Sequence, residues 1–228
     1  MNRRDFSQAA AGAVLMSSLA PMAAHSQGSK PAAGTDYLVL ETRAPVDAPA
    51  GKIEVVEFFW YSCPHCNAFE PTLEAWVKKL PKDVGFRRAP VAFREDFIPQ
   101  QRLYYALDAM GLVEKLHAKV FAAIHVDKLK LATGEAIVEW MGKNGVDTAK
   151  FQAEYNSFGV VTKTQRASQL QNAYKVEGVP ALGVAGRYYT DGSLAKSMER
   201  ALQVVDSLVA DLRPAAAKPA PAKANKKP

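Results

Sequence analysis

The strongest constraint on the fold is a change of hydrophobic period on either side of a cysteine pair. Residues Ile53–Tyr61 are apolar at both odd and even positions and rich in β-branched and aromatic side chains. This pattern is typical of a central strand covered on both faces. From Cys63 to Leu80 the apolar residues follow helical spacing instead. The motif Cys63-Pro64-His65-Cys66 therefore lies where a buried strand gives way to a helix.

The segments around this switch complete a strand–helix–strand unit. A short strand is predicted at 37–40, before the buried strand, and a second core strand at 84–93, after the helix. Pro71 stands inside the predicted helix, and because the apolar pattern resumes after it, we expect it to kink the helix rather than end it. The cysteines would then lie at the junction of the first strand and the helix of a βαβ unit.

The rest of the chain predicts a helical insertion in an α/β fold. Five successive helical stripes occupy residues 97–175. Strand patterns return at 181–184 and 187–190, joined by a predicted hairpin turn, and an amphipathic helix covers 198–212. We therefore expect one sheet domain, built from 27–96 and 176–212, with the helices inserted between its halves.

The N-terminus has the order of a bacterial export signal. A charged start containing Arg3 and Arg4 precedes an apolar stretch, and Ala24-His25-Ser26 fits a cleavage site, so 1–26 is predicted to be a signal peptide. The paired arginines indicate the twin-arginine route, while an ordinary secretory route stays open. We expect a protein exported to an oxidising compartment, where a cysteine pair can form a disulfide.

The basic character of the chain comes from its two ends. Residues 213–228 consist mostly of Ala, Pro and Lys and are predicted to be a disordered tail. The chain has 29 basic and 23 acidic residues; the signal and the tail hold seven of the basic ones and one acidic one, so 27–212 carries 22 of each. A neutral body gives no reason to expect nucleic-acid binding, which needs basic residues on a folded face.

The two cysteines are the only ones in the chain, and their spacing favours redox chemistry. A Cys-x-x-Cys motif next to a βαβ pattern is a redox signature. At the start of a helix Cys63 would meet unpaired N–H groups and the positive end of the helix dipole, which stabilise a thiolate. His65 can add a positive charge, Pro64 restricts the backbone between the sulfurs, and Cys66 is expected to be more buried. A stabilised thiolate is a good leaving group, so the disulfide would be strongly oxidising.

Other uses of the pair find less support. A zinc site needs two further ligands, and no second cysteine pair exists. A disulfide across so short a loop would add little stability. Haem attachment needs a histidine directly after the second cysteine, where Asn67 stands. His117 and His125 are eight residues apart and are interpreted as ordinary residues of a helix face. We therefore predict no metal and no cofactor other than the cysteine pair.

Two further features leave alternatives open. In Gly178-Val179-Pro180-Ala181 the proline is compatible with a cis bond, which would expose the Val179 backbone to an extended peptide, or with a plain trans turn. Glu57, six residues before Cys63, is either a semi-buried carboxylate that relays protons to Cys66 or a strand-end acid that faces water.

The motif and its surroundings resemble the DsbA family of thiol–disulfide oxidases. The resemblance rests on Cys-Pro-His-Cys after Glu-Phe-Phe-Trp-Tyr-Ser, on the following Asn-Ala-Phe-Glu-Pro, and on Gly-Val-Pro before a strand, and it covers about 36–212. It implies a thioredoxin-like fold with a helical insertion. It also implies a role for nine residues: Cys63 exchanges with substrate, Cys66 resolves, Pro64 and His65 stand between them, Pro180 is cis with Val179 at the substrate, and Glu57, Glu70 and Arg88 support the site.

The resemblance further implies a periplasmic monomer that oxidises newly exported, reduced and unfolded proteins. Its Cys63–Cys66 disulfide would be restored by a DsbB-type inner-membrane protein that passes electrons to quinone. A reductase or isomerase of the same fold is the alternative within this chemistry, and a peptide-binding chaperone is the alternative outside it. The signal and the Lys/Pro/Ala tail depart from the family pattern and leave the export route open.

Overall fold

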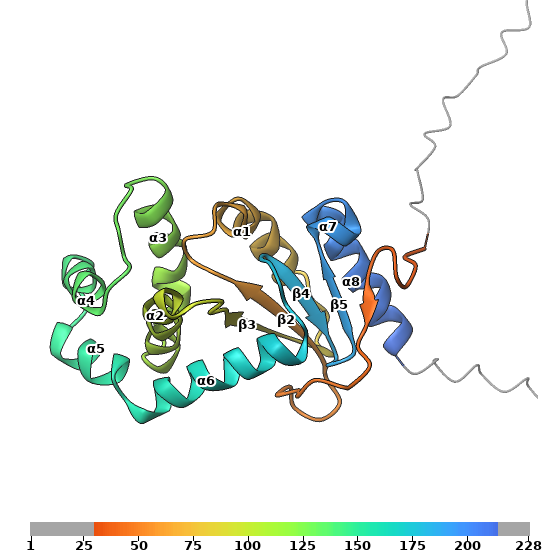
Figure 1. Cartoon of the computed structure of the whole chain (residues 1–228), viewed down its shortest axis with the longest axis horizontal. Coiled ribbons are helices and arrows are strands. Elements are labelled where there is room, and N and C mark those ends of the chain that lie inside the picture. The colour runs from red at the N-terminus through yellow and green to blue at the C-terminus, as the bar shows by residue number, and fades with distance from the viewer. Residues whose placement is uncertain (1–29, 214–228) are drawn as a thin grey trace, which may run out of the picture.

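Strand β2 (Ile53–Phe59) runs through the interior of the sheet, as its two-sided apolar pattern predicts. In the computed structural model, which describes residues 30–213, the sheet has the strand order β1-β5-β4-β2-β3 (Figure 1). Strand β3 (Val84–Pro90) pairs with β2 in parallel, and β4 (Ala181–Val184) pairs with its other edge antiparallel. Both edges of β2 are therefore hydrogen-bonded.

A hairpin extends the sheet beyond β4. Strand β5 (Tyr188–Asp191) lies antiparallel to β4, one residue later than its pattern predicts, and β1 (Leu38–Val39) forms the edge. The turn residues Ala185 and Gly186 have φ values of 52° and 68°. Two successive positive φ angles are typical of the tight turns that match the twist of a hairpin.

Helices cover both faces of the sheet. Helices α1 (Pro64–Val77) and α8 (Met198–Leu212) pack on the face that carries Val55. The opposite face, which carries Val56, packs against α6 (Phe158–Ala173). Side chains on both faces of β2 thus pack against apolar partners. Helix α1 continues through Pro71, as expected.

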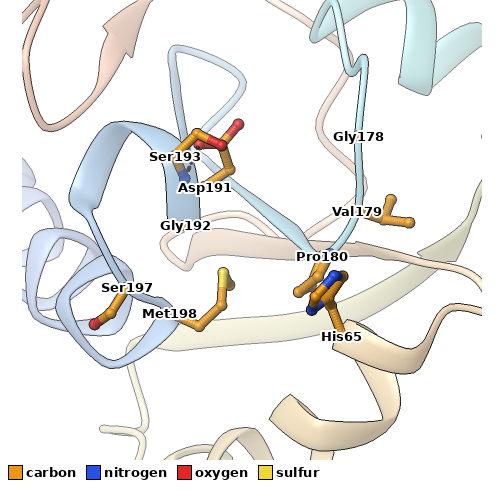
Figure 2. A pocket seen from close by; sticks show the side chains of 9 residues that line it. All are labelled: His65, Gly178, Val179, Pro180, Asp191, Gly192, Ser193, Ser197 and Met198. Carbon is orange, nitrogen blue, oxygen red and sulfur yellow. Dashed lines mark hydrogen bonds between the residues drawn. The ribbon is translucent and has the colours of Figure 1, made fainter.

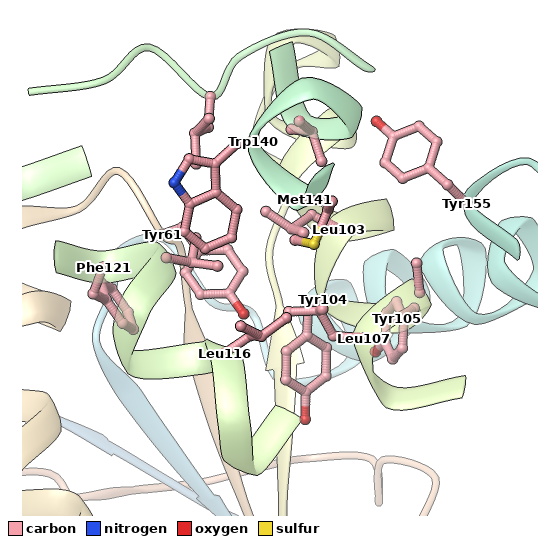
Figure 3. Close-up of a cluster of buried hydrophobic side chains, with 14 of the residues drawn as sticks. Tyr61, Leu103, Tyr104, Tyr105, Leu107, Leu116, Phe121, Trp140, Met141 and Tyr155 are labelled. Atoms are coloured by element: carbon pink, nitrogen blue, oxygen red, sulfur yellow. The ribbon is translucent and has the colours of Figure 1, made fainter. Parts of the chain in front are cut away.

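The remaining helices form a lobe beside the sheet. Figure 1 shows this lobe at one side, with α6 running back from it to β4. After the short 3₁₀ turn η1 (Glu95–Phe97), its helices are α2 (Ile98–Ala109), α3 (Val113–His125), α4 (Gly134–Lys143) and α5 (Thr148–Tyr155). Asp147 caps α5, because its Oδ1 accepts a hydrogen bond from Lys150 N at 3.0 Å. Aromatic and aliphatic side chains of the lobe form its own core (Figure 3).

The single-turn helix α7 (Gly192–Ala195) was not predicted from the sequence. Asp191 Oδ1 accepts hydrogen bonds from Ser193 N and Leu194 N at 2.9 and 2.8 Å and so caps this helix. A helix of one turn is too short to produce a hydrophobic period, and its cap residue is equally common in turns.

The predicted ends fall largely outside the described residues. The signal at 1–26 and the tail beyond Arg213 cannot be compared with the fold for this reason. Arg213 itself is bound to the body, since its Nε and Nη2 donate to the Asp83 carboxylate at 2.7 and 3.1 Å. Among residues 30–213, no helix has the length and apolarity needed to cross a membrane. The domain boundaries at 97 and 175 stay a prediction.

We expect Gly183→Ala in β4 to destabilise the fold by about 1–3 kcal/mol through overpacking. A Cβ at Gly183 would stand 2.8 Å from Val56 Cγ1 and overlap the Tyr174 ring. The free energy of unfolding from urea titration is the measurement. The matched control is Gly85→Ala in β3, where the nearest atom, Ala48 Cβ, is 3.5 Å away. Equal stability of the two variants would contradict this account of β4.

Candidate active site

The register of the central strands assembles the predicted site. Strand β3 places Arg88 directly beside Glu57, and β4 places Ala181 beside Phe58. The loop that precedes Ala181 therefore lies at the end of β2 that leads to Cys63. Residues from three distant parts of the chain converge at the carboxyl end of one strand.

Cys63 is the N-cap residue of α1. Its backbone is extended, with φ −79° and ψ 118°, and Pro64 follows at the first helical position, where its missing N–H costs nothing. Cys63 O accepts the first helical hydrogen bond from Asn67 N at 3.1 Å. The two thiols are present in the reduced form; Cys63 is 7% exposed and Cys66 is fully buried. The expected difference in burial between the cysteines is therefore present, though small.

The pKa values of the two thiols are shifted in opposite directions. The pKa of Cys63 is lowered to about 6, chiefly because the Cys66 thiol donates a hydrogen bond to it, with the backbone N–H groups of Cys66 and His65 and the charge of His65 adding to this. Burial opposes the shift. The pKa of Cys66 is raised, first by burial and then by the neighbouring Cys63 sulfur and the charge of Glu57. At neutral pH one sulfur is a thiolate and the other holds its proton.

The loop before β4 faces the Cys63 sulfur. The Val179–Pro180 peptide bond is cis, as the resemblance implies, and Cys63 Sγ lies 3.4 Å from Val179 O. His65 and Pro180 border one side of a groove of about 410 Å³, and Met198 reaches toward them from α8 (Figure 2). The groove is lined by His65, Gly178, Val179, Pro180, Asp191, Gly192, Ser193, Ser197 and Met198.

Glu57 is a buried carboxyl group and does not face water. It is on the same face of β2 as Val55, the face that α1 covers, and its exposed fraction is zero. Burial, followed by the charge of Glu70, raises its pKa from 4.5 to about 8, against the opposing charge of Arg88. Of the two alternatives left open by the sequence, the structure supports the buried one. Glu57 therefore holds a proton at neutral pH.

Arg88 links the two other predicted supporting residues, Glu57 and Glu70. Its Nε lies 3.0 Å from Glu57 Oε2, and its Nη2 donates to Glu70 Oε1 at 2.6 Å. The same Nη2 donates to Glu74 Oε1, also at 2.6 Å, and Glu74 is the only one of these carboxylates that is substantially exposed. Sequence reasoning missed Glu74, although its position one helical turn after Glu70 puts both on one face of α1.

His117 was wrongly interpreted as an ordinary helix-face residue. It is buried, its Nδ1 is 2.8 Å from Tyr61 Oη, and its Nε2 is 3.3 Å from Glu70 Oε1. Burial lowers its pKa, although Glu70 opposes this, so the neutral ring is favoured. With the tyrosine hydroxyl donating to Nδ1, the remaining ring proton is on Nε2 and points toward the Glu70 carboxylate. No local pattern could show this contact, because Tyr61 and His117 are 56 residues apart.

Comparisons with known proteins agree with this arrangement. The family model described as a DSBA-like thioredoxin domain matches residues 54–203. Thiol:disulfide interchange proteins DsbA of Burkholderia cepacia and Pseudomonas aeruginosa are 45% identical over 191 residues and 43% identical over 203 residues. These matches cover 84% and 89% of this chain and 90% and 95% of the relatives. The crystal structure of Pseudomonas aeruginosa DsbA aligns with a TM-score of 0.76 at 42% identity, covering 79% of this chain and 94% of that one.

We expect the reduced protein to show a single thiolate titration with a midpoint near pH 6, followed by ultraviolet absorbance. Because this pKa lies below the ordinary 9.0, the charged sulfur stabilises the reduced fold above pH 9, and this contribution is lost as the pH falls through 6. Cys63→Ser should remove the signal, since buried Cys66 keeps its proton. A signal that survives in Cys63→Ser and disappears in Cys66→Ser would reverse the assignment.

We expect Glu57→Gln to be more stable than wild type at pH 8, by about 4 kcal/mol. The folded pKa of about 8 exceeds the ordinary 4.5, so the unfolded chain releases this proton first and wild-type stability falls as the pH rises between these values. The gap between the two proteins should therefore be small at pH 5 and grow toward pH 8. Urea titrations at several pH values measure it, with the exposed Glu139→Gln as control. A gap that does not change with pH would show that Glu57 titrates normally.

Proposed function

The chain belongs to the DsbA family of thiol:disulfide interchange proteins, and we propose that it donates a Cys63–Cys66 disulfide to reduced, unfolded substrate proteins. It is thus a thiol:disulfide oxidoreductase with a thioredoxin-like fold. The proposal concerns the direction of exchange and the residues that perform it.

The main support for this direction of exchange is that the pKa of Cys63 is lowered while the pKa of Cys66 is raised. A thiol with a pKa of about 6 is a good leaving group at neutral pH. The form in which Cys63 is a free thiolate is therefore favoured over the form in which it is bonded to another sulfur. Electrons then flow from substrate to this protein, which makes the disulfide an oxidant.

The proposed reaction moves two electrons in two exchanges. A substrate thiolate attacks Cys63 Sγ, the bond to Cys66 breaks, and Cys66 leaves as a thiolate that takes up a proton. A second substrate thiolate then attacks the substrate sulfur of the mixed disulfide, and Cys63 leaves as a thiolate. The substrate gains one disulfide bond, and the protein ends as a dithiol.

Glu57 is proposed as the group that supplies the proton to Cys66. It holds a proton at neutral pH in a fully buried position, and it is close enough to Cys66 that its ionised form would raise the pKa of that thiol. A neutral carboxyl avoids two negative charges beneath α1 at the moment when Cys66 leaves. Arg88 and Glu70 are proposed to hold this carboxyl in place through the contacts described above.

The substrate is proposed to bind as an extended peptide across the loop before β4. Val179 carries a carbonyl 3.4 Å from the Cys63 sulfur, and Pro180 and His65 border the adjoining groove. Backbone groups of such a loop can pair with a peptide without regard to its side chains. This mode of binding suits an enzyme whose substrates share only their cysteines.

The cellular setting follows from the family and from the N-terminal sequence. We propose that the protein works in the periplasm as a monomer, and that a DsbB-type membrane protein accepts electrons from the dithiol and passes them to quinone. The predicted signal at 1–26, with its paired arginines, supports export. The thioredoxin-like domain is proposed to comprise 27–96 and 176–212, the helical domain 97–175 and the basic tail 213–228.

The function is tested by incubating the oxidised protein with a reduced, unfolded substrate. We expect one substrate disulfide to form per protein molecule consumed, and we expect Cys63→Ser to reduce the rate to that of the uncatalysed reaction. Mass spectrometry of the alkylated substrate measures the product. Glu139→Gln, at an exposed position of α4, is the control and should retain full activity. Oxidation by Cys63→Ser at the wild-type rate would exclude the proposed chemistry.

The alternatives predict different results in the same set of proteins. A redox equilibrium with glutathione that favours the dithiol form supports an oxidase, and one that favours the disulfide form supports a reductase. A chaperone would bind an unfolded peptide equally well after both cysteines are replaced by serine, and would oxidise nothing.

A further inference from the structure

The turn between β2 and α1 is held mainly by side chains of the inserted helical region. Within the turn, Cys63 N donates to Trp60 O at 3.0 Å. The two residues between them, Tyr61 and Ser62, direct their polar groups to helices α2 and α3 instead. The segment that carries Cys63 into the helix start is therefore fixed from a different part of the chain.

Gln100 makes the most extensive of these contacts. Its Oε1 accepts a hydrogen bond from Ser62 N at 3.1 Å, and its Nε2 donates to Ser62 Oγ at 2.7 Å. The same nitrogen donates to Leu131 O at 3.0 Å, in the loop between α3 and α4. Gln100 is 3% exposed. A primary amide offers two N–H donors and one carbonyl, so every polar function of this side chain is used.

Tyr61 is held at both of its ends by α3. His125 Nε2 is 2.8 Å from Tyr61 O; because a carbonyl only accepts, this nitrogen carries the proton. Tyr61 Oη meets His117 Nδ1, as described for the site. Figure 3 shows the Tyr61 ring among side chains of the helical lobe, and it packs against Phe121 with ring centres 5.1 Å apart. The Tyr61 ring thus anchors one part of the turn in the helical lobe, and Gln100 holds the polar groups of Ser62.

We propose that Gln100 is a positioning residue for the redox reaction, which fixes Ser62 and thereby sets the redox equilibrium of the Cys63–Cys66 pair. Gln100 touches neither sulfur and acts through the backbone of the turn. The inference rests on the proposed redox role of the two cysteines.

The physical reason is that a thiolate is stabilised by N–H groups only while they point at it. The sulfur of Cys63 depends on donors within the first turn of α1, so a tilt of the preceding residue moves the sulfur relative to all of them. Loss of the Gln100 contacts frees Ser62 N and lets the turn relax. The reduced form then loses stabilisation that the disulfide form does not have, and the pair becomes a weaker oxidant.

Gln101 provides a matched comparison for Gln100. It is the next residue of α2, it is 1% exposed, and its Nε2 donates to Pro90 O at 2.8 Å and lies 3.4 Å from Ser168 Oγ. Neither partner belongs to the turn before Cys63. The two glutamines therefore have equal burial and similar hydrogen bonds, and they differ in whether they hold the turn.

The experiment compares Gln100→Met with Gln101→Met in the full chain. Both replacements keep an unbranched side chain of similar length and remove the amide. For Gln100→Met we expect the equilibrium constant for oxidation of glutathione to fall about fivefold, the factor that the loss of one ordinary hydrogen bond produces. The thiolate titration midpoint should rise in parallel. For Gln101→Met we expect the wild-type constant and midpoint, even where thermal unfolding shows a loss of stability.

Ser62→Ala tests the same contact from its other partner, at a half-buried site that tolerates a smaller side chain. We expect a smaller shift in the same direction, and no additional shift when it is combined with Gln100→Met, since Gln100→Met already removes the contact that Ser62→Ala removes. Equal redox constants in Gln100→Met and wild type, or equal shifts in the two methionine variants, would overturn the proposal. A wild-type protein without redox exchange would instead refute the function itself, so the two failures are distinguishable.

Discussion

Strand β2 is hydrogen-bonded along both edges and buried on both faces, and this confinement determines where each reactive group can lie. Its parallel neighbour β3 places Arg88 beside Glu57, and its antiparallel neighbour β4 places the Val179–Pro180 loop beside its carboxyl end. Helix α1 starts one short turn after the strand ends, so Cys63 lies between the N–H groups of the helix start and the Val179 carbonyl. A central strand has little freedom to shift its register, because a slip of one residue would turn its apolar face to the wrong layer.

A cluster of charged side chains beneath α1 also depends on this strand. Glu57, Glu70 and Glu74 surround the single guanidinium of Arg88, so three carboxylates face one positive charge. Such a group is least costly to bury when one carboxyl remains neutral, and Glu57 is the most deeply buried of the three. The protein thus keeps a titratable proton on Glu57, while Glu74 connects the same cluster to the surface.

Sequence reasoning was most successful where the signal is local. The two-sided apolar pattern identified β2, and the change of period located the start of α1. It could not decide whether Glu57 is buried, because that depends on which helix covers its face. The contacts of His117 and Gln100 were missed entirely, since their partners in the turn lie 56 and 38 residues away. The predicted supporting roles of Glu70 and Arg88 came from resemblance alone. The register of β2 and β3 places Arg88 beside Glu57, and the packing of α1 on the sheet brings Glu70 to the same guanidinium.

The distance along the chain between the two sides of the active site has a consequence for biosynthesis. Val179 lies 116 residues after Cys63, and the whole helical insertion is made between them. A ribosome therefore delivers the cysteine motif long before the loop that faces it, and the pair of thiols exists for that interval without its completed surroundings. Contacts of such long sequence separation also form late and slow the folding of a domain. The chain acquires its cysteines first and its redox site only after a further 116 residues have been made.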